Sequence, residues 1–240
     1  MELLFFIIII TFACFLQGIV GFGFALIAAP LVLIFLEKET VVSSMLIVGI
    51  IINGFLIKKI QKPVNYKIIA FLFLASLIGM PLGIRILNTI PMNSMKVLVG
   101  TLVIIFAIIL SFQKIRLPKS DFLTLIAGFI SGLLNTSTSM SGPPAVLLLT
   151  GENLQKDEFR KTLACFFFLM SVVSLTLFIT NKIITFQRVI FGLISIPLVF
   201  LGAFLGDKMA TKMPQKIFRF LVLGIVFLSG LYTIFSGLKY

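Results

Sequence analysis

The sequence predicts an all-α, polytopic integral membrane protein of two inverted-topology repeats, with broken or re-entrant half-helices near the bilayer midplane. Three observations lead there: extreme hydropathy, a series of apolar segments, and an internal repeat. The 240 residues are 60% hydrophobic and only 12% charged, with 27 Phe, and the mean hydropathy is +1.21. A soluble domain of this length could not cover so much apolar side chain, so most of the surface must face lipid.

The apolar sequence divides into ten segments. A bilayer core about 30 Å thick needs about 20 helical residues to cross it. Segments 22–36, 121–134 and 139–150 are shorter, and they flank the interrupted stretches "GIVGFG" (18–23) and "NTSTSMSGPP" (135–144). Two half-length helices at each interruption would form either one broken span or a re-entrant hairpin. The predicted segments are 3–20, 22–36, 43–57, 67–88, 96–112, 121–134, 139–150, 161–179, 188–206 and 217–236.

An internal repeat divides the chain into halves near 1–115 and 116–240. Residues 18–35 align without gaps over 132–149, which places Gly18 on Gly132 and Pro30 on Pro144. Residues 79–96 align in the same way over 202–219. We therefore predict two homologous membrane repeats that together form one transport domain.

Each half holds an odd number of segments, so the second half should enter the membrane from the opposite face. The basic residues follow the same pattern. Loop 37–42 has one against three in 151–161, loop 58–67 has four against two in 180–188, and loop 88–96 has one against three in 207–216. With the richer loops in the cytoplasm, we predict an inner (cytoplasmic) cell membrane location and both termini on the outer face. The net charge of +12 then reflects this bias, and we expect no nucleic-acid partner.

Interrupted helices at matching positions of inverted repeats indicate a transporter's binding site. Unwound backbone survives in a membrane only where protein or a wet cavity satisfies it, and a half-helix N-terminus favours an anion. The opposing interpretation is that the glycines serve only tight packing and the hydroxyls bond to their own helix. The predicted substrate-binding residues are Gly18, Gly21, Gly23, Asn135, Thr136, Ser137, Thr138, Ser139, Ser141 and Gly142.

Other residues have supporting roles in this prediction. Gln17 and Asn53 are further polar candidates for the lining of the site, and Pro30, Pro143 and Pro144 are predicted structural helix breaks. A cage of neutral hydrogen-bond donors would hold the anion.

Several chemistries lack the residues they need. There is no His, and the two cysteines lie in apolar runs, so we expect no metal site, no cofactor and no disulfide framework. No base lies near Ser139 or Ser141 in sequence to activate a nucleophile, so we expect no enzyme. Every Asp and Glu lies at a segment end or in a loop, which disfavours relay of H⁺ by a buried carboxylate. Coupling to Na⁺ at backbone carbonyls, or no coupling, remains open.

The blocks "GIVGFGFALIAAPLVLIF", "NTSTSMSGPPAVLLL", "GMPLGIRIL" and "GAFLGDKMATKMP" resemble those of the TauE/SafE sulfite-exporter family of membrane permeases. The resemblance covers essentially the whole chain. It implies transport of small sulfur-containing anions, such as sulfite or organosulfonates, across the cytoplasmic membrane, without fixing the direction. The motif positions that carry over are Gly18, Gly21, Gly23, Pro30, Asn135, Ser141, Gly142, Pro143 and Pro144.

The function predicted from the sequence is therefore a permease that moves a small anion by alternating access within the lipid bilayer. Two alternatives stay open: a carrier for another small anion or an amino-acid-like solute, and a membrane factor that transports nothing. The sequence leaves open the substrate, the direction, the coupling ion and the oligomeric state.

Overall fold

The fold is described from a computed structural model of the chain, in residues 1–111, 118–152, 154–210 and 215–239. These residues form helices and connecting turns, with no strand among them, so the prediction of an all-α chain is confirmed. The helices are α1 (Glu2–Val20), α2 (Phe24–Val32), α3 (Lys38–Lys59), α4 (Tyr66–Thr89), α5 (Met92–Ser111), α6 (Asp121–Thr138), α7 (Gly142–Thr150), α8 (Lys156–Thr180), α9 (Phe186–Ile194), α10 (Ile196–Met209) and α11 (Gln215–Leu238).

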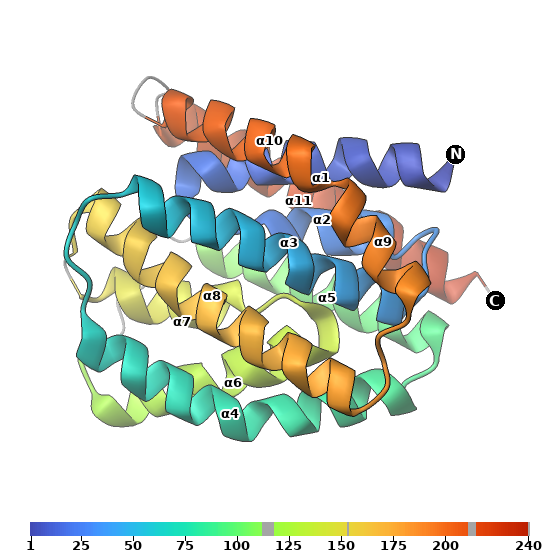
Figure 1. Cartoon of the computed structure of the whole chain (residues 1–240), viewed down its shortest axis with the longest axis horizontal. Coiled ribbons are helices and arrows are strands. Elements are labelled where there is room, and N and C mark those ends of the chain that lie inside the picture. The colour runs from blue at the N-terminus through green and yellow to red at the C-terminus, as the bar shows by residue number, and fades with distance from the viewer. Residues whose placement is uncertain (112–117, 153, 211–214, 240) are drawn as a thin grey trace.

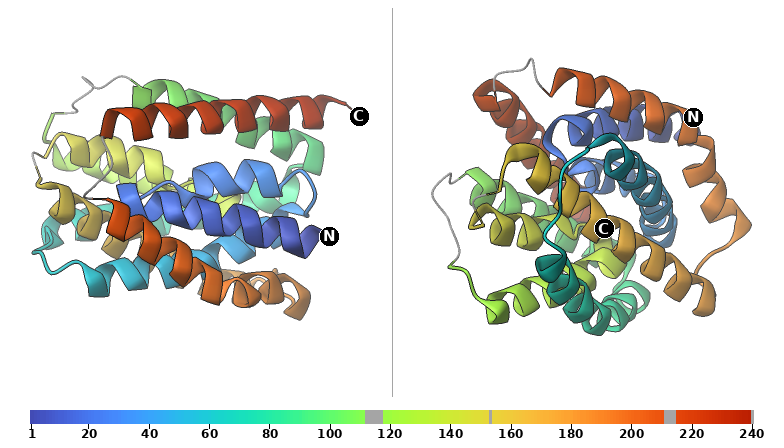
Figure 2. Two further views of the ribbon diagram at one scale, coloured as in Figure 1. Left: turned by 90° about the horizontal axis from the view of Figure 1, so that it is seen from above. Right: turned by 60° about the vertical axis from the view of Figure 1, so that its left-hand side comes forward.

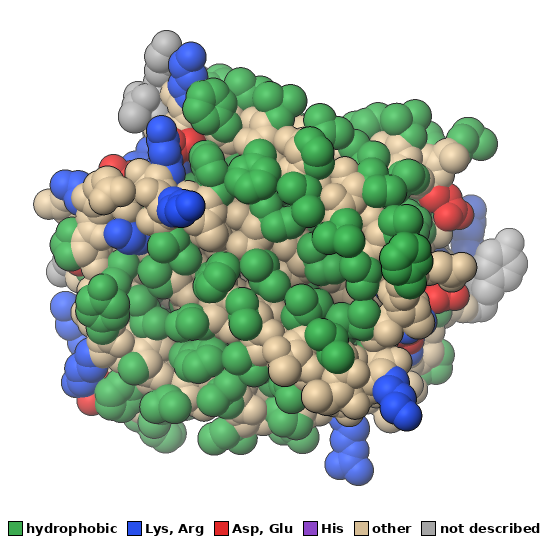
Figure 3. Space-filling view, viewed as in Figure 1, with side chains coloured by type: hydrophobic (Ala, Val, Ile, Leu, Met, Phe, Trp, Pro, Cys, Tyr) green, Lys and Arg blue, Asp and Glu red, His purple; other side chains and the backbone are tan. Residues whose placement is uncertain are grey.

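Multiple helices have the length and composition of membrane spans. Within the described ranges there are six such candidates, and α9 with α10 counts as one of them. Figure 3 shows apolar side chains over the middle of one face, with Lys and Arg side chains gathered near its ends. The candidate spans are Glu2–Val20, Lys38–Lys59, Tyr66–Thr89, Met92–Ile109, Lys156–Thr180 and Phe186–Met209.

Local sequence accounts for several helix ends. The side chain of Asn65 caps α4 by accepting a hydrogen bond of 3.2 Å from the amide of Ile68. Asp157 and Glu158 lie in the first turn of α8, where a negative charge interacts favourably with the positive end of the helix dipole. The single predicted segment 188–206 is divided at Ser195 into α9 and α10. Pro197, in the first turn of α10, has no N–H to continue the ladder.

Two boundary predictions were wrong in an instructive way. Helix α6 continues to Thr138, whereas the segment was predicted to end at 134. The hydroxyls of Thr136, Ser137 and Thr138 each bond a carbonyl four residues earlier, so these polar residues are compatible with a helix. The break is therefore confined to three residues, and α6 is longer than the sequence suggested.

The prolines also differ from the prediction. Pro30 was predicted to break a helix, but α2 continues through it to Val32. Only one helical hydrogen bond is lost, because proline lacks the N–H that would donate to the carbonyl four residues earlier. The carbonyl of Pro30 accepts a bond of 3.0 Å from Thr233 Oγ1. Pro143 and Pro144 lie in the first turn of α7, where the missing N–H groups interrupt nothing. They begin a helix after the break.

The helices pack in matched pairs across the two halves of the chain. Helix α4 packs along α6, α1 along α10, α3 along α8, and α5 along α11. Figure 1 shows both termini at the same end of the molecule, and the views of Figure 2 show α5 and α11 side by side. Glycines allow close approach: a Cβ at Gly79 would lie 2.1 Å from the Phe129 carbonyl oxygen, and one at Gly206 would lie 2.1 Å from that of Phe15.

Candidate functional site

The first break connects α1 to α2 through three residues that include two glycines with left-handed backbone. Gly21 has φ 93° and ends α1, and Gly23 has φ 102° and begins α2. An L side chain rarely adopts such angles. The amide of Gly21 donates a hydrogen bond of 2.6 Å to the Gln17 carbonyl. Helix α2 packs against α1.

The second break resembles the first at its start but has one left-handed residue instead of two. Ser139, at φ 62°, ends α6 in the left-handed region, and Ser141 begins α7. The amide of Ser139 donates a bond of 3.1 Å to the Asn135 carbonyl. Helix α7 has nine residues, as does α2, and it packs back against α6.

The two breaks correct the alignment on which the repeat was first argued. Gly21 and Ser139 occupy the same place in the turn and are 118 positions apart (139 − 21). The gapless sequence alignment used 114 (132 − 18), which is about one helical turn less. In the structure Gln17 therefore matches Asn135, and Gly18 matches Thr136. A sequence alignment that relies on small residues and prolines cannot distinguish the spacing of 114 positions from that of 118, because both spacings align similar residue types.

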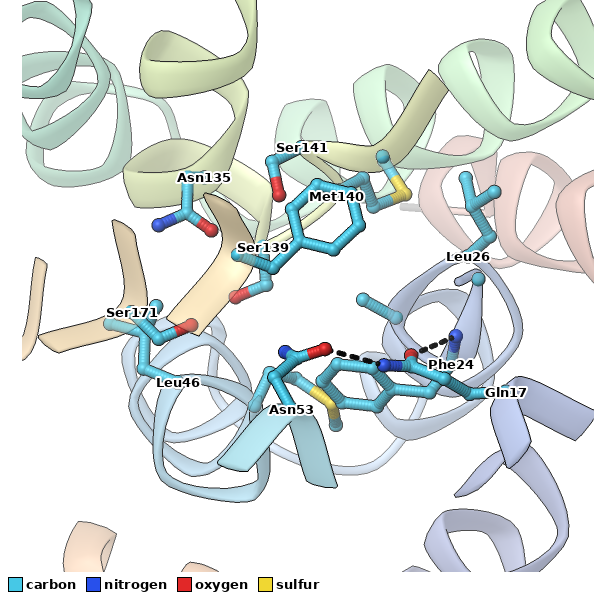
Figure 4. A pocket seen from close by; sticks show the side chains of 15 residues that line it. Gln17, Phe24, Leu26, Leu46, Asn53, Asn135, Ser139, Met140, Ser141 and Ser171 are labelled. Atoms are coloured by element: carbon cyan, nitrogen blue, oxygen red, sulfur yellow. Dashed lines mark hydrogen bonds between the residues drawn. The ribbon is translucent and has the colours of Figure 1, made fainter. Parts of the chain in front are cut away.

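A small cavity lies between the two breaks (Figure 4). Its volume is about 30 Å³, enough for about two waters. None of its lining residues carries a charge. The lining residues come from α1, α2, α3, α6, α7, α8 and both breaks: Gln17, Gly23, Phe24, Ala25, Leu26, Met45, Leu46, Asn53, Asn135, Ser139, Met140, Ser141, Gly142, Phe167 and Ser171.

On the side of the first break, a closed hydrogen-bond chain forms the polar wall. Gln17 Nε2 donates to Asn53 Oδ1 at 3.0 Å, and Gln17 Oε1 accepts from the amide of Phe24 at 3.2 Å. Asn53 Nδ2 in turn donates to the Gly49 carbonyl at 2.8 Å. Gln17 and Asn53 are each only 1% exposed. Most polar atoms of this wall are therefore already paired, and these hydrogen bonds connect α1, α2 and α3.

On the side of the second break, more polar atoms are free. Asn135 Nδ2 donates to Ser174 Oγ at 2.8 Å, and Ser139 Oγ donates to the Val42 carbonyl at 3.3 Å. The hydroxyls of Ser141 and Ser171 line the cavity and have no hydrogen-bond partner within the part of the chain that the structure describes. These two hydroxyls can turn toward a guest.

Backbone amides add a second set of donors, and α2 supplies more of them than α7. Ala25 and Leu26, in the first turn of α2, are among the residues that line the cavity, and their amides have no partner among the described residues. In the first turn of α7 only Gly142 has an N–H, because Pro143 and Pro144 follow it and proline has no amide hydrogen. The half-helix dipole is present at both breaks, but α2 supplies the amides and α7 relies on hydroxyls.

Some of the predicted site residues line the cavity together, and others do not line it. Gly18, Gly21, Thr136, Ser137 and Thr138 do not line the cavity. Thr136 Oγ1 donates to the Met80 carbonyl at 2.7 Å and so ties α6 to α4. The predicted residues that line the cavity are Gln17, Gly23, Asn53, Asn135, Ser139, Ser141 and Gly142.

Sequence reasoning missed Ser171 and Ser174 on α8. They lie three positions apart in an apolar segment and so share a helix face, which is a signal that could have found them. It also missed Arg160, which was counted only as a loop charge. The side chain of Arg160 is 3% exposed and packs behind Gly21. Among the described residues no group of three or more His, Cys, Asp or Glu side chains could hold a metal ion.

Comparison with known proteins gives one match. The family model described as "Sulfite exporter TauE/SafE" matches residues 6–233, which is nearly the whole chain. No curated protein matches, and no solved structure matches.

Proposed function

The chain belongs to the sulfite exporter TauE/SafE family, and we propose that it carries a small oxyanion, sulfite or an organosulfonate, across the cytoplasmic membrane by alternating access. Membership makes it a membrane protein of a transporter family. The substrate, the mechanism and the absence of catalysis are our proposals. The observation that carries them is the uncharged cavity between two helix breaks, whose lining residues include some with unpaired hydroxyl groups or unpaired backbone amides.

We propose that residues 1–115 and 116–240 are inverted repeats. The left-handed residue that ends both α1 and α6 supports this, and so do the equal lengths of α2 and α7. So does the packing of α1 on α10 alongside that of α6 on α4, since a two-fold relation exchanges these pairs. The loops rich in Lys and Arg would lie in the cytoplasm, with both termini on the outer face.

The proposed binding site consists of neutral donors. The hydroxyls of Ser141 and Ser171 and the amides of Ala25, Leu26 and Gly142 would hold the oxygen atoms of the anion. Such donors act more strongly in a dry, low-dielectric site than in water. The remaining predicted residues, Gly18, Gly21 and Thr136 to Thr138 among them, would set the helix geometry around the site.

The cavity volume bears on the mechanism. A space for about two waters is too small for an ion of one sulfur and three oxygens. We propose that this conformation is closed, and that the two halves rock apart to widen the cavity toward one face and then the other. For coupling, we propose either Na⁺ at backbone carbonyls or no coupling ion.

Flux of radiolabelled sulfite into proteoliposomes tests this proposal. We expect saturable uptake by the native protein, and at least a tenfold lower kcat/KM for a Ser141→Ala, Ser171→Ala double variant, since two hydrogen bonds to a charged group are worth about 3 kcal/mol. Ser137→Ala is the matched control, because that hydroxyl bonds only the Leu133 carbonyl of its own helix. Native flux in the double variant would remove the site. A panel with taurine, sulfate and neutral solutes of similar size separates the substrate classes.

A further inference from the structure

Arg160 is a buried charge immediately behind the first break. It lies in the second turn of α8 and is 3% exposed. Its side chain fills the space that Gly21 leaves open, since a Cβ on Gly21 would lie 2.5 Å from Arg160 Cγ. Buried ionisable groups in membrane proteins are costly, and they usually mark an ion pathway.

The guanidinium joins three elements but is incompletely paired. Nη2 donates to the Gly18 carbonyl at 2.5 Å and to Asp207 Oδ1 at 2.8 Å, while Nη1 donates to Asp157 Oδ1 at 3.1 Å. Nε is buried and has no partner in the described chain. The Nε and Nη2 edge is the edge that binds two oxygens of one oxyanion side by side. Asp207 occupies it with a single oxygen.

Charged groups of both signs surround Arg160. Arg160 lies at the end of the molecule where α3 ends and α8 begins, which we call the basic end (Figure 1). Lys156 lies in the same first part of α8, and its ammonium group donates to the Ala210 carbonyl at 2.6 Å. The Asp207 side chain is 17% exposed, so a solute from this end can reach the carboxylate that Arg160 holds.

The other half of the chain has no counterpart. At the spacing of 118 positions, Arg160 corresponds to Val42, and Val42 contributes only a carbonyl to Ser139 Oγ. At the spacing of 123 positions that relates α10 to α4, Asp207 corresponds to Ile84. A purely architectural pair would be expected at both ends of a repeated structure. This one is present at the basic end alone.

We propose that Arg160 is a second anion site, an entrance site at the basic end, where an oxyanion displaces the Asp207 carboxylate before it moves past Gly21 to the central cavity. This inference rests on the proposed function and adds a one-sided capture step to it. In the closed state Asp207 occupies the guanidinium. A sulfite or sulfonate takes its place with two oxygens on Nε and Nη2, and Asp207 returns when the anion leaves.

Sulfite binding to the purified protein tests this step, measured as sulfite-dependent thermal stabilisation at constant ionic strength. Removing the competing charge in Asp207→Asn is expected to tighten the apparent Kd at least threefold. Arg160→Gln is expected to raise the apparent Kd at least tenfold. Arg160→Lys is expected to have a Kd between those of the native protein and Arg160→Gln, because lysine keeps the charge but cannot bind two oxygens side by side. Lys67→Gln is the matched control, since Lys67 pairs with Asp121 on the exposed surface; its Kd should stay native.

The outcomes separate the two proposals. If Asp207→Asn binds sulfite no more tightly than the native protein, the pair only joins helices and the entrance site is refuted, whether or not Arg160→Gln folds. If the Arg160→Gln, Asp207→Asn double variant regains the native Kd, the inference is likewise overturned. A native protein that binds sulfite through Arg160 but gives no flux in proteoliposomes would refute the proposed transport and leave this site standing.

Discussion

The two breaks both follow a helix that ends in a left-handed residue, but they differ in chemistry. The first uses Gly21 and Gly23 for its left-handed residues, and its nearby side chains, Gln17 and Asn53, are bonded to each other. The second places Ser139 at the left-handed position and leaves hydroxyls unpaired around the same cavity. The first break thus depends on glycines that adopt left-handed angles and on side chains that are bonded to each other. The second break has hydroxyls that are free to bond the proposed ligand.

For the binding site that we propose, this difference would allow an uncharged cavity to select an anion. A rigid, paired wall fixes the shape of the cavity, while free donors on the facing wall meet the oxygen atoms of the ligand. If both walls were paired, an anion would lose its hydration without replacement, and the cost of burying it would be large. If both walls were free, several buried polar groups would lack partners in the empty state.

The largest effect that breaks this comparison is expected from Gly21→Ala. The new Cβ adds a left-handed L residue at φ 93° and a contact of 2.5 Å with Arg160 Cγ, together costing about 2–5 kcal/mol. Gly23→Ala is the matched variant, since it has φ 102° and no atom within 4 Å, and it should cost about 1–2 kcal/mol. Thermal unfolding in detergent measures both. Equal losses would show that Arg160 does not pack on Gly21 as described.

A second pair of variants distinguishes the paired wall from the free wall. Gln17→Ala leaves Asn53 Oδ1 and the Phe24 amide without partners, at about 1–3 kcal/mol for each. In Asn135→Ala, Ser174 Oγ loses one donor, but it can turn its own proton to a carbonyl of its helix. That loss is about 1 kcal/mol.

The ratio of the two losses is the measurement. We expect the midpoint of thermal unfolding to fall at least twice as far for Gln17→Ala as for Asn135→Ala. A larger fall for Asn135→Ala would reverse the roles assigned to the two walls.

The sequence was sufficient for the parts of this design that depend on local chemistry. Apolar length predicts the helices, and Gly21 and Gly23 mark the first break because few other residues adopt their angles. The polar run after Leu134 marked the second break, but too widely. A Ser or Thr that bonds its own helix and one that ends the helix look alike in sequence, so only Ser139 to Ser141 proved to be outside α6 and α7.

Long-range pairing was beyond local reasoning. Arg160 is 142 positions from Gly18 and 47 from Asp207, and nothing in "KDEFRK" distinguishes a buried guanidinium from a loop charge. Ser171 and Ser174 acquire meaning only when α8 is placed beside α3 and α6. The register of the repeat failed for a related reason, since a slip of one turn preserves residue type but changes which side chain faces the cavity.

The smallest effect comes from Ser139→Gly, which gives the second break the residue type that ends α1. Glycine removes the left-handed cost of about 1 kcal/mol, and the variant loses the 3.3 Å bond from Ser139 Oγ to Val42, worth about 0.5–1.5 kcal/mol. We therefore expect the free energy of unfolding to change by less than about 1 kcal/mol, measured by thermal unfolding in detergent. A fall of several kcal/mol would mean that this hydroxyl holds α3 against the break. The second break would then depend on side-chain pairing as much as the first, and the contrast between the two walls would have to be abandoned.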